Sequence, residues 1–133
     1  MVVNIIKQDK VMIMSSLRNS VQLLGRLGTD AQVKVSQNGV AYCIIRFVTN
    51  ITYLDKDNKQ VTNSQWHTLS VWGNLTKHLE KKGQKGSLWL IQGRLVHSKY
   101  TNRNGEEKQS TEVRVDRLLF LSGKGESSPA MAT

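Results

Sequence analysis

The sequence predicts an all-β domain, a five-stranded Greek-key barrel with one short helix between the third and fourth strands. Three observations predict it. Apolar and polar residues alternate at the period of a strand along much of residues 21–121. The dipeptides Asn38-Gly39 and Asn104-Gly105 are strong hairpin signals. The period changes at residues 74–85, where Leu75 and Leu79 stand four apart among Lys and Glu, as is typical of a helix.

The individual strands follow from this alternation and from the turn residues between them. We expect strands at residues 21–27 with a short continuation at 32–36, and at 40–53, 65–72, 87–100 and 109–121. Residues 55–60 are polar and charged throughout, which indicates an exposed hairpin loop. Gly25 and Gly93 fall inside strands, where a small, sharply bent barrel tolerates or needs glycine. Asn74 is a candidate cap for the helix, which Gly83 and Gly86 can end.

The length of 133 residues suits a single domain. We divide the chain into an N-terminal extension (1–18), the barrel domain (19–123) and a small, polar tail (124–133) that we expect to be disordered. The extension lacks the features of a secretory signal, and no run approaches the ~18 apolar residues of a membrane span. The single cysteine, Cys43, excludes an internal disulfide, favours a reducing compartment and is expected in the core.

Residues 65–72 carry the most informative alternation. His67, Leu69 and Val71 share one strand face, which is expected to be the core side. The other face places Trp66 and Trp72 among small hydroxyl residues, where partial exposure is expected. Two flat rings along a polar strand face suit the stacking of nucleic-acid bases. Burial of both rings is an equally good interpretation of this pattern alone, because Trp is usually well buried.

The charge of the chain favours an anionic partner. The net charge is +9 and the pI is near 9.9, values that suit nucleic acid or an anionic membrane surface. Residues 76–108 hold eight Lys and Arg against three Glu, with Tyr100 among them. A merely solvated basic face is the alternative to a phosphate-binding one. Trp89 shares its strand face with Ile91 and is expected in the core.

Residue patterns for catalysis are missing from the sequence. His67, His78 and His97 lie far apart and have no cysteine or acidic partners at metal-ligand spacing, so we expect no metal site. The sequence also has no Gly-rich phosphate loop, nucleophile elbow or obvious acid–base carboxylate pair. We therefore expect no cofactor, no small-molecule substrate and no enzymatic activity.

An ordered set of short motifs lies within the stretch from residue 19 to about residue 123. They are Gly25-Arg26-Leu27-Gly28-Thr29-Asp30, Trp66-His67, Gly73-Asn74-Leu75, Lys85-Gly86, Ile91-Gln92-Gly93-Arg94-Leu95, Lys99-Tyr100, Asn104-Gly105 and Thr111-Glu112-Val113. In this order and spacing they resemble the bacterial-type single-stranded-DNA-binding proteins. The predicted barrel agrees with this resemblance, because five strands with one helix match the oligonucleotide/oligosaccharide-binding (OB) fold, whose strand face and loops hold single strands.

The resemblance implies sequence-nonspecific binding of single-stranded DNA in DNA replication, recombination or repair. It places the family's stacking aromatics on Tyr53, Trp66, Trp72 and Tyr100. Strand parity gives no information on Tyr53, since its strand is apolar on both faces. The residues expected to bind phosphates are Arg26, Lys34, Lys85, Arg94, Lys99, Arg103 and Lys108. The resemblance also implies a cytoplasmic, nucleoid-associated homotetramer with His67 near a subunit contact.

The sequence also departs from the family pattern. Ala31 replaces a usual proline, and Gln65 and Gln92 replace common glutamates. Family members commonly end in an acidic tip with a final Phe that docks partner enzymes, whereas Lys124 and Glu126 are the charges of residues 122–133 and cancel. We therefore expect no enzyme recruitment through an acidic tip. Two alternatives stay open, namely RNA binding by the same fold and an accessory role in a replication or conjugation complex.

Overall fold

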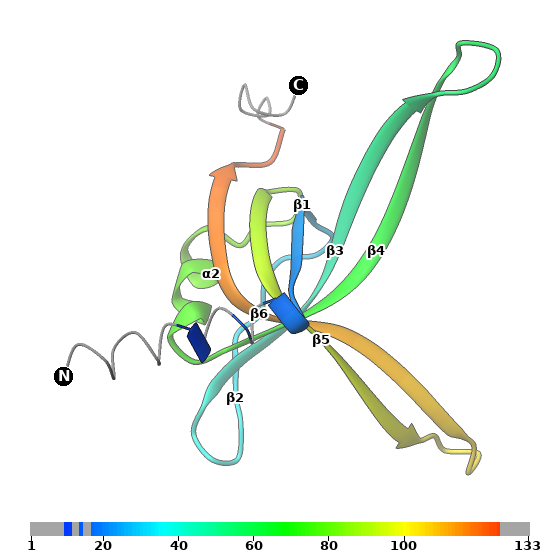
Figure 1. The fold of residues 1–133 in the computed structure, drawn as a ribbon. Helices are drawn as coiled ribbons and strands as arrows, with labels where there is room; N and C mark the ends of the chain where they lie inside the picture. The colour runs from blue at the N-terminus through cyan, green and yellow to red at the C-terminus, as the bar shows by residue number, and fades with distance from the viewer. Residues whose placement is uncertain (1–9, 12–13, 15–16, 126–133) are drawn as a thin grey trace.

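The structure, a computed structural model, describes residues 10–11, 14 and 17–125 and is drawn in Figure 1. Its elements are β1 (Val21–Leu27), β2 (Lys34–Val35), β3 (Ala41–Leu54), β4 (Gln60–Trp72), the 3-10 turn η1 (Gly73–Leu75), the helix α2 (Thr76–Lys82), β5 (Leu88–Thr101) and β6 (Glu107–Ser122). The prediction of a disordered tail falls almost entirely on residues outside those described.

The strands close into a barrel. Their order is β1-β5-β6-β4-β3-β2, and β1 pairs in addition with β3, with Arg26 opposite Val48 and Leu27 opposite Phe47. β4 and β6 run parallel where they meet, and the other pairs are antiparallel. The predicted all-β OB-fold barrel, with its short helix between the third and fourth long strands, is confirmed.

Two hairpins continue beyond the barrel and project away from it in different directions (Figure 1). β3 pairs with β4 as far as Leu54 opposite Gln60, and β5 with β6 as far as Thr101 opposite Glu107. We call them the β3–β4 arm (residues 49–65) and the β5–β6 arm (residues 96–112). The strand starts predicted at residues 65 and 109 were therefore wrong. The missed residues 60–64 and 107–108 are mostly exposed and polar, so no apolar alternation marks them in the sequence.

The core lies inside the barrel. Trp89 is 1% exposed, packs edge-to-face on Phe120 with ring centroids 5.3 Å apart, and donates from Nε1 to Ser87 Oγ at 2.8 Å, so its predicted core position is confirmed. Cys43 is fully buried, also as predicted, and burial raises the pKa of its thiol. The buried cluster comprises Leu27, Cys43, Ile45, Phe47, Leu69, Val71, Leu79, Trp89, Ile91, Val113 and Val115. No helix among the described residues is long and apolar enough to cross a membrane.

The helical segment consists of η1 and α2. α2 ends at Lys82 before Gly83, the first of the two glycines predicted to end it. Asn74 is not its cap, because Leu75 occupies that position and no side chain caps the helix. Gly25 shows why glycine is needed in a strand here, since a Cβ would collide with the Val48 carbonyl oxygen and lie 2.9 Å from Phe47 Cε2. The closing β1–β3 pair therefore depends on the missing side chain.

Candidate nucleic-acid interface

The outward face of β3, β4 and β6 carries the predicted tryptophans. Trp66 is 54% exposed and Trp72 is 36% exposed, while Leu69 and Val71, on the other face of β4, are 2% and 1% exposed. The predicted assignment of the two faces of β4 is confirmed. Two large rings are thus kept out of a core that has its own aromatic residues, Trp89 and Phe47.

Trp72 is the centre of a stack across three strands. The Tyr42 ring on β3 lies at 5.1 Å between centroids and 24° between planes. The Arg114 guanidinium on β6 lies 5.4 Å from the Trp72 ring centroid. Because β3 and β6 flank β4 on opposite sides, Tyr42 and Arg114 cover opposite faces of the Trp72 ring. Stacking and cation–π attraction hold this ring upright on the sheet.

Trp66 has a different setting. The Arg46 guanidinium lies 5.5 Å from its ring centroid. Its edge packs on Gly28, where a Cβ would lie 2.5 Å from Trp66 Cζ3. The ring is therefore fixed by a glycine and a cation while half of it faces solvent.

Sequence reasoning missed three members of this face: Tyr42, Arg46 and Arg114. The first two alternate with Cys43, Ile45 and the other buried residues of β3, so strand parity could have placed them outside. Arg114 needed the parallel register of β4 and β6, where it lies opposite Ser70. That register is a long-range feature with no local sequence signal.

Ser70 departs from the expectation for its face. It lies between Ile44 and Arg114 in the ladders but is 1% exposed. Its Oγ has no hydrogen-bond partner among the described residues. The outward face is thus closely packed at its centre and exposed at the rings.

The two tyrosines lie on the arms. Tyr53 is 50% exposed and Tyr100 is 53% exposed. Tyr100 shares a ladder face with Arg94, which is opposite Arg114, so it continues the outward face that carries Trp72. Tyr53 does not, because the β3–β4 ladder is uninterrupted and puts Tyr53 on the same face as His67 and Leu69. The structure therefore brings three of the four predicted rings onto one continuous face, with Tyr53 on the reverse of its arm.

Of the seven predicted phosphate-binding residues, three lie along the outward face and four lie elsewhere. Lys34 lies opposite Tyr42, and Lys108 lies opposite Tyr100 with its Nζ 3.3 Å from a Glu106 carboxylate oxygen. Together with Arg94 they border the outward face.

The other four cations lie apart from that border. Lys99 is on the reverse face of the β5–β6 arm, opposite Gln109, and Arg103 is in its terminal turn. Lys85 precedes β5 and donates its backbone N–H to the Asp30 carboxylate at 2.7 Å. The Arg26 guanidinium donates to the Gly86 carbonyl oxygen at 2.7 Å and so has a structural contact of its own.

His67 lies at the base of the β3–β4 arm, opposite Phe47. Its Nε2 is 3.0 Å from Thr49 Oγ1. Partial burial lowers the pKa of His67, since desolvation disfavours the imidazolium form. Its predicted place at a subunit contact stays a prediction.

A closed β-barrel with exposed rings and arginines along one wall defines an OB-fold binding domain. Comparison with known proteins identifies the family of this domain. The single-strand binding protein family matches residues 18–121, so the chain belongs to that family.

Individual relatives agree with this assignment. Single-stranded DNA-binding proteins of Neisseria meningitidis serogroup A and Xanthomonas axonopodis pv. citri are 30% and 32% identical over 110 and 108 residues, which are 83% and 81% of this chain. The matched regions span 63% and 60% of those relatives' lengths. A structure described as a Plasmodium falciparum SSB complex with ssDNA superposes with a TM-score of 0.71 at 27% identity, and the match covers 78% of this chain and 95% of that chain.

Proposed function

We propose that this protein binds single-stranded DNA with little sequence preference, in DNA replication, recombination or repair. One observation carries the proposal: Trp66, Trp72 and Tyr100 are large rings exposed on one continuous face, and two of them have guanidinium groups against them. Every base has a π-face, so such rings accept any sequence. The names of the relatives and the single strand in the Plasmodium falciparum complex support the same ligand.

Electrostatic attraction supplies the second part of binding. Lys34, Arg94 and Lys108 border the exposed face, and Arg46 and Arg114 lie within it. Each phosphate that they neutralise releases counterions, so log affinity should fall with log salt by about 0.7 per phosphate on a single strand. Stacking fixes the bases and the cations hold the backbone between them. Binding of this kind requires no chemical step, and the absence of enzymatic activity stays a prediction.

Self-association is the second part of the proposal. The outward surface of β1, β5 and β6 carries a cross-strand row in which Leu24 lies opposite Leu90 and Leu90 opposite Leu119. Leu24 is 39% exposed and Leu119 is 56% exposed, which supports burial of this row between copies of the chain. A homotetramer, with His67 near a contact, is the state we propose. Sedimentation equilibrium should show it, and Leu119→Lys should lower the oligomeric state.

One titration tests the ligand. The protein is titrated with poly(dT), poly(rU) and a duplex at about 50 and 200 mM salt, conditions between which phosphate-driven binding changes strongly. We expect quenching of tryptophan fluorescence and much tighter binding of poly(dT) than of duplex. Equal affinity for poly(rU) and poly(dT) would favour the RNA-binding alternative, because stacking alone does not distinguish the sugars. Preference for the duplex would contradict the proposal.

A further inference from the structure

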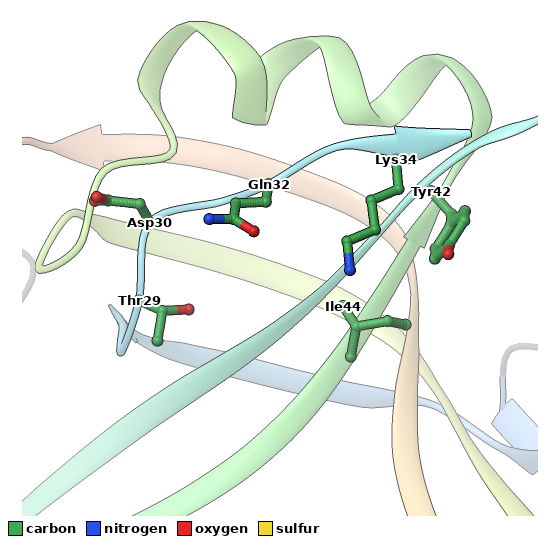
Figure 2. Close-up of a pocket in the computed structure, with 6 residues that line it drawn as sticks. All are labelled: Thr29, Asp30, Gln32, Lys34, Tyr42 and Ile44. Atoms are coloured by element: carbon green, nitrogen blue, oxygen red, sulfur yellow. The ribbon is translucent and has the colours of Figure 1, made fainter. Parts of the chain in front are cut away.

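A cleft adjoins the open end of the Tyr42–Trp72–Arg114 stack. It has a volume of about 380 Å³ and is lined by Thr29, Asp30, Gln32, Lys34, Tyr42 and Ile44. Figure 2 shows these side chains between the segment that leads into β2 and the adjacent part of β3. The volume falls within the range of pockets that hold small organic ligands.

The stack decides which ring face is open to a base. Trp72 is covered by Tyr42 on the β3 side and by Arg114 on the β6 side. Tyr42 has Trp72 on one face, and its other face looks away from β4 toward β2, where the cleft lies. Tyr42 therefore presents the free face of the stack, and Trp72 supports it from behind. Trp72 itself is 36% exposed, so a base can still reach it where Tyr42 and Arg114 leave the ring open.

From this geometry we propose that the cleft is a nucleotide subsite, in which one base of the bound strand stacks on the open face of Tyr42 and Lys34 holds an adjoining phosphate. The subsite rests on the proposed binding of single strands and assigns a contact to a residue outside the four predicted rings. Ile44, which is 53% exposed, adds an apolar wall beside Tyr42. A base against these two side chains gains both stacking and apolar contact.

The polar lining suits the rest of a nucleotide. In Figure 2 the Lys34 side chain extends from β2 into the space between Thr29 and Tyr42, and the Thr29 hydroxyl points into the same space. Lys34 lies opposite Tyr42 in the β2–β3 ladder, so its ammonium group and the ring belong to one site. Asp30 points away from this space, and its carboxylate accepts the Lys85 N–H at 2.7 Å. The Asp30 carboxylate is thus engaged by the Lys85 backbone, whereas the Lys34 ammonium group faces the cleft.

Photocrosslinking tests the subsite directly in the unaltered protein. A single-stranded oligonucleotide of thymidines with 5-iododeoxyuridine at every position is bound and irradiated, and the crosslinked peptides are identified by mass spectrometry. We expect a crosslink at Tyr42. Crosslinks at Trp66 and Tyr100 without one at Tyr42 would overturn the subsite and leave the proposed function standing. No binding of the oligonucleotide at all would overturn both.

Variants of Tyr42 and Lys34 test how much the subsite contributes to binding affinity. Tyr42→Leu should weaken poly(dT) binding by roughly 5- to 150-fold, the loss expected for one stacked base, whereas Tyr42→Phe keeps the ring and should bind nearly as the unaltered protein does. Lys34→Ala should reduce the salt slope by about 0.7. Lys77→Ala is the charge-matched control, because Lys77 is exposed on α2 and does not line the cleft. Equal affinity of Tyr42→Leu and the unaltered protein, or equal slopes for Lys34→Ala and the unaltered protein, would contradict the subsite.

Discussion

Replacing Gly28 by alanine tests whether the position of the Trp66 ring, and not merely its presence, governs strand binding. A Cβ at residue 28 would lie 2.5 Å from Trp66 Cζ3 and 3.3 Å from the Arg46 carbonyl oxygen. Carbon atoms in ordinary contact are about 3.5–4.0 Å apart, so the edge of the ring has to retreat by about 1 Å. The ring is 54% exposed and can move outward. The free energy of unfolding should therefore change by less than about 1 kcal/mol.

The same displacement should be measurable in binding. A stacked base contributes about 1–3 kcal/mol, and a ring shifted by about 1 Å should lose part of it, so we expect an affinity loss near 1 kcal/mol, or about fivefold. Fluorescence titration with poly(dT) and thermal unfolding measure the two quantities.

A second glycine provides the control. Gly25→Ala should destabilise the barrel, because its Cβ would meet the backbone of Val48 and the buried ring of Phe47. Unchanged poly(dT) affinity in Gly28→Ala, or an unfolding loss as large as that of Gly25→Ala, would refute the reasoning.

Three further predictions address stacking, charge and pH. Trp66→Ala should cost about 1–3 kcal/mol of binding with little loss of stability, whereas Trp89→Ala should cost about 3–5 kcal/mol of stability; inverted results in titration and denaturation would mean that the faces are misassigned. Arg94→Gln removes one of two arginines directly opposite each other, so it should raise the free energy of unfolding by about 0.2–1 kcal/mol while reducing the salt slope by about 0.7, and a stability loss would contradict this. Because burial lowers the pKa of His67, the unfolded chain takes up the proton more readily, and stability should fall as pH drops from about 6.5 through the lower folded pKa. His67→Gln should flatten that fall in denaturant unfolding measured between about pH 5 and 8, and an identical fall would rule out His67 as its source.

The fold could be predicted because its signals are local. The dipeptides Asn38-Gly39 and Asn104-Gly105 mark their hairpins, and the alternation of residues 65–72 places the core side of β4. The main miss in the arms was the start of β4, which begins at Gln60 and not at residue 65. Residues 60–64 pair with β3 through the backbone and through the Thr62–Thr52 and Ser64–Asn50 side-chain hydrogen bonds. They are mostly exposed and polar, so they lack the apolar alternation that reveals a strand.

The candidate site was harder to predict, because it depends on the arrangement of distant strands. Arg114 reaches Trp72 through the β4–β6 register, and the Arg26 guanidinium contacts the Gly86 carbonyl oxygen, 60 residues along the chain. The sequence placed Trp72 on the outward face. It could not show that Tyr42 and Arg114 would lie against the Trp72 ring. The structure thereby adds the partly exposed Tyr42 as a further ring at the open end of the stack.

The placement of the rings also bears on how a single strand is distinguished from a duplex. Tyr53 and Tyr100 lie on the two arms, and the arms project in different directions (Figure 1). The β3–β4 ladder places Tyr53 on the face opposite to that of Trp66. A ligand that reaches all of them has to bend between the arms and pass around an edge. Smooth bending of a duplex of 20–30 base pairs by 40–90° costs on the order of 1–6 kcal/mol, and its bases are already stacked on one another. A flexible single strand meets neither cost, so the same arrangement that separates the rings should disfavour duplex DNA.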